Sequence, residues 1–221
     1  MANVEHSTLT GADLHEPKGI AAAIADRVYV SNGSGSGSWT TVPDAAISDA
    51  AKIFSKQYVT LSDTVGSGTS GGGSLTSSSW NTRRLNTKTI DWLGISLSSN
   101  QFTLPAGQYI VMGWSRSLAT QDLGAGGVCQ GTAELRLYNV TDGVTVVNGG
   151  GWTYLGDSGA GGTVNDNIYL PILGWFNIGG TKTFALQQWV RNISSCTFTA
   201  GSAVSSGDNE KYSELIIWKV A

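Results

Sequence analysis

The sequence predicts a mainly β protein, an antiparallel sandwich or jelly roll preceded by a smaller N-terminal part. Thirty glycines against four prolines in 221 residues indicate many tight turns and argue against proline-rich disorder. From residue 58 onward, apolar and β-branched runs alternate with glycine, asparagine and aspartate turn signals. The only convincing helical periodicity lies before that point. Many short strands with almost no helix are typical of an all-β domain.

Residues 1–42 are expected to form a segment with a short helix and a β-hairpin. Pro17 suits the first position of a helix, and the alanines after it extend that helix for about two turns. The stretch "RVYVSNGSGSGSWTTV" has two β-type runs on either side of Asn32-Gly33, which predicts a hairpin with a long tip. Because an isolated hairpin is marginal in water, this one needs a surface to pack on.

Residues 43–57 have the clearest helical pattern, and Pro43-Asp44 marks the start of the helix. Its apolar stripe consists of Ile47, Ala50, Ala51 and Phe54. A narrow stripe at three- and four-residue spacing is typical of the seam of a short helical bundle, here a trimer stem. A helix that lies on its own domain explains the stripe equally well.

Residues 58–221 are predicted to form the sandwich itself. Pro105-Ala106-Gly107 predicts a turn between two strands, and Asp142-Gly143 predicts a type I′ hairpin turn. In the last strand the alternation puts Ser213, Leu215 and Ile217 on one face. The opposite face then carries Tyr212, Glu214, Ile216 and Trp218.

Charge and targeting signals exclude several classes of partner. A formal net charge of -3 argues against nucleic-acid binding, and Arg83-Arg84 is expected to have an ordinary strand-edge role. We find no signal peptide and no apolar run near the ~20 residues of a membrane span, so a soluble, cytosolically made protein is expected. Cys129 and Cys196 could pair, but a reducing compartment favours free thiols.

The candidate catalytic and metal motifs are weak. Gly66-Ser-Gly68-Thr-Ser-Gly71 matches G-x-G-x-x-G, but no helix is predicted after it, so a flexible loop is the better interpretation. His6 and His15 are the only histidines and are too far apart to share one helical face, so no metal site or cofactor is expected. The carboxylates that could do acid–base chemistry lie in turn-rich stretches: Asp157, Asp166, Asp208 and Glu210. We therefore predict that the protein is not an enzyme.

Three aromatic residues are candidates for stacking on sugars: Trp152, Tyr154 and Trp175. Packing in the core or between subunits is the favoured interpretation of the same residues.

The segment from His6 to Trp39 resembles the N-terminal segment of a family of tailed-bacteriophage virion proteins. The resemblance rests on His-Ser-x-Leu-Thr-Gly-x-x-Leu-His-x-Pro, an alanine-rich turn and Val-Tyr-Val-x-Asn-Gly-x-Gly-Ser-Gly-x-Trp. The downstream part is similar to trimeric phage jelly rolls of the tumour-necrosis-factor and complement-globular type. The stretches that carry this similarity are "WNTRRLN", "ISLSSNQFTLPAGQYIV", "LRLYNVTDG" and "ELIIWKV".

The resemblance implies a homotrimer on the surface of the phage particle, assembled in the host cytoplasm. Its N-terminal segment would bind the capsid or another virion protein, and its jelly-roll head would project outward. The residues expected to anchor it are His6, Leu9, Leu14, His15, Pro17, Ile20 and Ile24. Two functions stay open: a head fibre or capsid decoration, which the single compact domain favours, and a tail fibre or receptor-binding protein whose loops adhere to host glycans.

Overall fold

A computed structural model describes residues 28–31, 37–41, 57–123, 128–157, 162–194 and 196–220. The chain divides into two units, Met1–Ser48 and Asp49–Ala221. In the first unit, β1 (Val28–Ser31) pairs antiparallel with β2 (Gly37–Thr40), which confirms the predicted hairpin. The predicted helix after Pro17 lies outside the described residues, and so does the 43–57 helix apart from Gln57.

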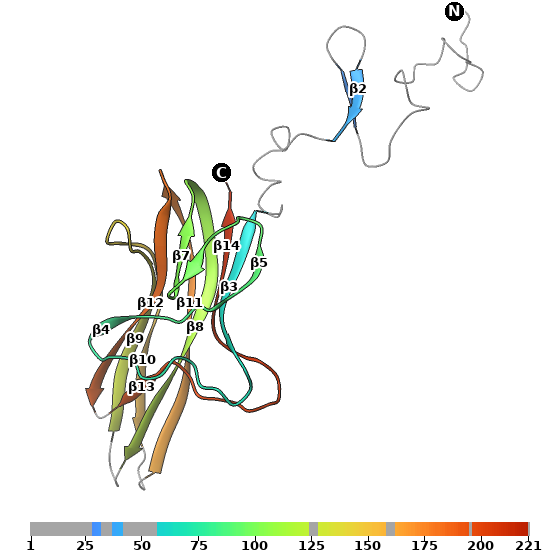
Figure 1. The fold of residues 1–221 in the computed structure, drawn as a ribbon. Coiled ribbons are helices and arrows are strands. Elements are labelled where there is room, and N and C mark those ends of the chain that lie inside the picture. The colour runs from blue at the N-terminus through green and yellow to red at the C-terminus, as the bar shows by residue number, and fades with distance from the viewer. Residues whose placement is uncertain are drawn as a thin grey trace, which may run out of the picture. The chain divides into compact units, whose positions relative to one another are not determined.

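The second unit is a sandwich of two antiparallel β-sheets, which confirms the predicted mainly β class (Figure 1). The first sheet has the strand order β11-β8-β14-β3-β5, with β13 pairing a further part of β8. Its strands are β3 (Tyr58–Val65), β5 (Thr87–Asp91), β8 (Gly107–Leu123), β11 (Gly162–Ile178), β13 (Thr197–Thr199) and β14 (Glu210–Lys219).

The second sheet has the order β10-β9-β12-β7-β6, with β4 also pairing β12. Its strands are β4 (Ser79–Thr82), β6 (Leu97–Ser98), β7 (Gln101–Leu104), β9 (Val128–Asn139), β10 (Val144–Asp157) and β12 (Lys182–Ser194). The antiparallel pairs β9–β10, β8–β11, β7–β12 and β3–β14 are nested in the sequence, each enclosing the one before it. In the second unit, each of these strand pairs therefore lies within the next pair along the sequence, and the pairs are divided between the two sheets.

The core lies between the two layers and is filled by the inward side of each strand. Phe184 of β12 packs against Phe102 and Phe176, with ring centroids 5.8 Å and 5.4 Å apart. In β14, Leu215 and Ile217 are fully buried as the alternation predicts. Tyr212, predicted on the opposite face, is also buried, because a bulge between Lys211 and Ser213 interrupts the alternation.

The Asp142-Gly143 turn differs from the type I′ prediction. The connection between β9 and β10 has four residues, 140–143, and Gly143 alone among them has a positive φ, of 70°. A type I′ turn needs positive φ at both central residues, so the prediction was wrong. The Asn139 carbonyl accepts from the Gly143 N–H at 2.9 Å, and the Asn139 side chain accepts from the Asp142 N–H at 3.0 Å. These two bonds favour the longer loop.

Cys129 and Cys196 form a disulfide, so the prediction of free thiols was wrong. Both residues are buried, and their Cα atoms lie 5.1 Å apart, within the range that a disulfide requires. The bond joins β9 in the second sheet to the residue just before β13 in the first. It therefore ties the two layers together, a contact that sequence separation alone does not reveal.

Candidate functional site

The predicted anchor and stem residues lie outside the described residues. These are His6, Leu9, Leu14, His15, Pro17, Ile20 and Ile24 of the anchor, and Ile47, Ala50, Ala51 and Phe54 of the stem. The functional surfaces below therefore all belong to the sandwich.

The three candidate sugar-stacking aromatics do not form one site. Trp175 is 68% exposed and Trp152 is 52% exposed, whereas Tyr154 is 7% exposed and packs in the core. Gly150 of β10 lies against Pro171 of β11. Because β10 and β11 run in opposite directions, two residues further along β10 this alignment places Trp152 opposite Tyr169. Trp152 then lies about six residues along β11 from Trp175, or roughly 20 Å. The two exposed tryptophans are therefore too far apart to stack on the same sugar ring.

The outer side of the first sheet carries a continuous apolar surface, which we call the apolar face. One row across four strands joins Trp175, Ile110, Trp218 and Tyr58 through the pairings of β11, β8, β14 and β3. The next row joins Leu173, Met112 and Ile216. The exposed fractions of Leu173 and Met112 are 70% and 45%, so much of this surface is open to solvent in one chain. Sequence reasoning assigned only Trp175 to a surface role.

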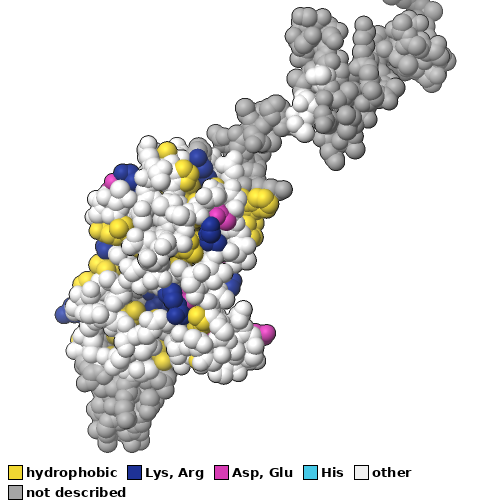
Figure 2. Space-filling view, viewed as in Figure 1, with side chains coloured by type: hydrophobic (Ala, Val, Ile, Leu, Met, Phe, Trp, Pro, Cys, Tyr) yellow, Lys and Arg dark blue, Asp and Glu magenta, His cyan; other side chains and the backbone are white. Residues whose placement is uncertain are grey.

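Polar groups bound the apolar face at one end. Trp114 packs on Tyr169 with ring centroids 5.7 Å apart, and Arg116 lies over the same Tyr169 ring at 5.8 Å. The guanidinium of Arg116 also donates two hydrogen bonds to Asn167 Oδ1, at 3.0 Å and 2.7 Å. Apolar side chains with a polar margin are the usual composition of a protein interface. On the side seen in Figure 2 the charged side chains form small, separate groups on a mostly uncharged surface.

Arg83 is buried rather than placed at a strand edge, which corrects the prediction for the Arg83-Arg84 pair. Its side chain is 1% exposed, and its Nη2 donates to the carbonyl oxygens of Arg116 and Ala200 at 3.0 Å and 2.9 Å. Nε and Nη1 have no partner among the described residues. Burial lowers the pKa of Arg83 to about 10, although nearby Asp63 opposes the shift, so the side chain is still charged at pH 7.

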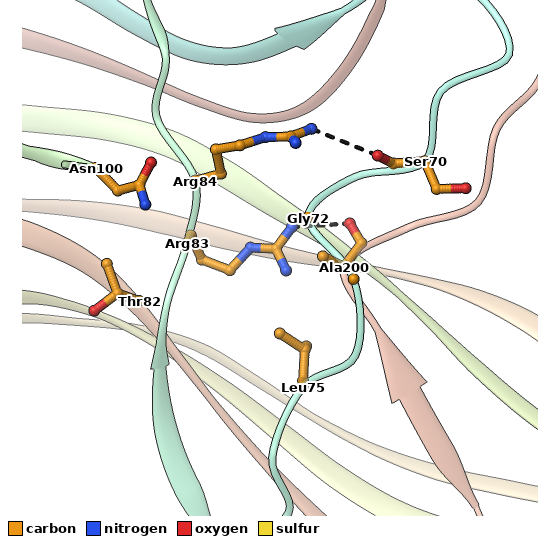
Figure 3. A pocket seen from close by; sticks show the side chains of 9 residues that line it. Ser70, Gly72, Leu75, Thr82, Arg83, Arg84, Asn100 and Ala200 are labelled. Atoms are coloured by element: carbon orange, nitrogen blue, oxygen red, sulfur yellow. Dashed lines mark hydrogen bonds between the residues drawn. The ribbon is translucent and has the colours of Figure 1, made fainter. Parts of the chain in front are cut away.

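Arg84 extends toward Ser70 (Figure 3). It also ion-pairs with Asp63, with its Nε 2.6 Å from Asp63 Oδ1. The two arginines line a pocket of about 380 Å³ together with Ser70, Gly72, Thr82 and Asn100. We call this the arginine pocket.

Glu210 links the loop after β3 to the loop between β13 and β14. Its carboxylate accepts backbone N–H bonds from Gly68, Val204 and Ser205 at 2.8–2.9 Å and a short hydrogen bond from the Tyr212 hydroxyl. These bonds, the one from Tyr212 foremost, lower the pKa of Glu210 to about 2. A carboxylate that stays ionised is a poor general acid at neutral pH. The G-x-G-x-x-G stretch lies in this loop region between β3 and β4, and no helix follows it.

The other three carboxylates predicted as acid–base candidates are Asp157, Asp166 and Asp208. Asp208 is exposed, and the side chains of Asp157 and Asp166 lie outside what the structure describes. Within the described ranges no three His, Cys, Asp or Glu residues are grouped to hold a metal ion. In the same ranges no helix has the length and apolar character to cross a membrane. The absence of catalytic function stays a prediction.

No protein-family model matches the chain, and no curated protein matches it.

Proposed function

We propose that the protein is a bacteriophage virion structural protein, a homotrimeric head fibre or capsid decoration. Residues 1–42 would attach it to the capsid, and the β-sandwich would project outward. The single observation that carries the assembly part of this proposal is the apolar face of the first sheet. The virion part rests on the resemblance of the segment from His6 to Trp39.

The apolar face needs a partner on energetic grounds. An aromatic side chain can bury about 150–250 Å², so the face offers several hundred Å² of contact surface. Burial of apolar area is worth about 25 cal/mol per Å², a gain that a single chain leaves unused at Leu173, Trp175 and Met112. Exposed apolar patches of this size usually mark interaction sites. Other copies of the chain can cover this uncharged surface, and in a ring of three the face of each copy would pack against its neighbours around the three-fold axis.

The strand pairing supports a jelly-roll topology for each subunit. The four nested pairs alternate between the sheets, β9–β10 and β7–β12 in the second and β8–β11 and β3–β14 in the first. A long hairpin wound in this way produces two four-stranded sheets, the arrangement of a jelly roll. It also leaves the outer side of the β11-β8-β14-β3 sheet available for assembly.

The N-terminal unit supports attachment to a particle. Its described part is a hairpin of two four-residue strands, which is too small to be stable alone. Ordering such a segment costs conformational entropy that burial against another surface can offset. A capsid lattice supplies that surface, and a low charged fraction of 13% suits close packing on it.

The assembly proposal is tested by placing a charge in the apolar face. Met112→Glu and Leu173→Glu should convert a trimer into 23.1 kDa monomers, because each trimer would otherwise bury three carboxylates. Ile193→Glu is the matched control, since Ile193 is 46% exposed on β12 of the other sheet and Met112 is 45% exposed. Light scattering coupled to gel filtration measures the mass. A monomeric wild-type protein, or variants that remain trimeric, would refute the proposal.

The attachment proposal is tested by truncation. A protein lacking residues 1–42 should remain trimeric yet no longer bind phage particles in a co-sedimentation assay. Binding by the truncated protein would show that the anchor lies elsewhere.

A second candidate function is adhesion to host glycans by a fibre. It is favoured by Trp152, whose side chain is 52% exposed. Binding of the isolated sandwich to a glycan array, lost in Trp152→Ala, would support this candidate over a purely structural role.

A further inference from the structure

The arginine pocket has more positive than negative charge. Arg83 and Arg84 contribute two cations, and among the described residues Asp63 is the one carboxylate that ion-pairs with Arg84 and acts on the charge of Arg83. Asp63 uses Oδ1 for Arg84, while Oδ2 has no partner among the described residues. The pocket therefore has a net positive charge that its own side chains do not neutralise.

The burial of Arg83 makes this excess charge significant. A buried charge is costly unless it is fully hydrogen-bonded or paired. Arg83 Nη2 donates hydrogen bonds to two neutral carbonyl groups, and Nε and Nη1 have no hydrogen-bond partner among the described residues. With 1% exposure it lies beneath the surface of the pocket, so it acts on a ligand as a fixed positive charge. At low effective dielectric such a charge favours an anion in the pocket.

Arg84 supplies the accessible contact. Its side chain is 30% exposed, and its hydrogen bonds engage Nε with Asp63 and Nη2 with the Ser70 carbonyl, the latter a long 3.5 Å. Nη1 makes no hydrogen bond within the described part of the chain, so it can donate to a ligand. Carboxylates match the planar donors of a guanidinium and form the stronger, charge-assisted type of hydrogen bond.

The rest of the pocket is small and mostly polar, with Leu75 and Ala200 as its apolar lining residues. Ser70, Thr82 and Asn100 provide hydroxyl and amide groups, and Gly73 at the rim has no atom within 4 Å of the place where a Cβ would lie. A volume of about 380 Å³ is at the lower end of small-molecule sites and suits one monosaccharide. A ligand with a carboxylate and neighbouring hydroxyl groups fits this arrangement, because the arginine can bind the carboxylate and the neutral polar groups can hydrogen-bond to the hydroxyls.

We propose that the arginine pocket binds an acidic monosaccharide unit through its carboxylate. Arg84 contacts the carboxylate, Arg83 supplies a buried supporting charge, and the polar side chains receive the sugar hydroxyls. This site goes beyond the proposed structural function, and it shares no residue with the apolar face. Its success or failure is therefore independent of trimer assembly.

The test is a titration of the full-length ¹⁵N-labelled protein with glucuronate, followed by the NMR signals of Arg84 Nε and the Gly73 amide. Glucuronate should shift both signals and glucose should shift neither. Absence of any shift with glucuronate would overturn the proposal. Equal affinity for glutamate would overturn the assignment to a sugar, and tighter binding of inorganic phosphate would overturn the assignment to a carboxylate.

Two rim variants separate charge from shape. Gly73 has a φ of 83°, a conformation that Asn and Asp tolerate better than other side chains, so Gly73→Asn and Gly73→Asp should both fold. Gly73→Asp should weaken glucuronate binding about tenfold, as expected for a like charge about 6 Å away at an effective dielectric constant of about 40. Gly73→Asn should bind like the wild type. Equal binding by the two variants would overturn the proposal, and the mass of each variant reports separately on assembly.

Discussion

Removal of the disulfide between Cys129 and Cys196 is expected to destabilise the sandwich by about 4 kcal/mol. The two residues are 67 positions apart, and closing a loop of about that length removes roughly 15 cal/mol/K of entropy from the unfolded chain. Both residues are buried, so reduction leaves the two sulfur atoms in place and costs little packing. For a domain of this size the loss corresponds to a melting temperature about 8–16 °C lower.

The assay is urea unfolding at fixed protein concentration, with the disulfide intact and with it reduced under mildly denaturing conditions. Fixed concentration is necessary because assembly shifts apparent stability by mass action. Cys129→Ala with Cys196→Ala is the control, and its stability should be low and unaffected by reductant. If the oxidised and reduced proteins unfold within about 0.5 kcal/mol of each other, the loop-closure argument fails for this bond.

Two further predictions concern the loops near Glu210. Because the pKa of Glu210 is about 2 in the folded protein against 4.5 ordinarily, its contribution to stability is complete above about pH 4.5 and is lost as the pH falls toward 2. Glu210→Gln should therefore flatten the decrease in unfolding free energy between pH 5 and 3, and an unchanged slope would exclude the role of this carboxylate. Gly201→Ala should destabilise the fold by roughly 2–4 kcal/mol, since its Cβ would lie 2.3 Å from the Tyr212 ring at a φ of 122°. Chemical denaturation measures this, and a change under 1 kcal/mol would show that the Tyr212 ring moves freely.

The sequence was sufficient for the fold class because strand periodicity is a local property. The hairpin at residues 28–40 and the burial of Leu215 and Ile217 both follow from short stretches read alone. The turn at Asp142-Gly143 was mispredicted because loop length depends on where β9 and β10 begin to pair, and dipeptide preference does not fix that point.

The arginine pocket could not be predicted, for a related reason. Nothing in the local sequence distinguishes Arg83, which is buried, from Arg84, which is partly exposed. The difference arises because the chain after β4 passes beside Ala200 and Arg116, residues more than 30 positions away whose carbonyl groups receive the Arg83 side chain. Two adjacent arginines in a sequence therefore do not reveal which of them is buried, because burial depends on these long-range neighbours.

The apolar face, by contrast, could be predicted from the sequence, because some of its strands have apolar residues on both sides. In β14, Leu215 and Ile217 point into the core, yet their outward neighbours Ile216 and Trp218 are also apolar. In an antiparallel sheet with one wet side, outward positions are normally polar. A strand that is apolar on both sides is instead typical of a sheet covered on both sides, and in β11 Leu173 and Trp175 extend the same pattern. The core covers one side of this sheet, and the two-sided pattern favours a second covering on the other side, which other copies of the chain would provide in the proposed assembly.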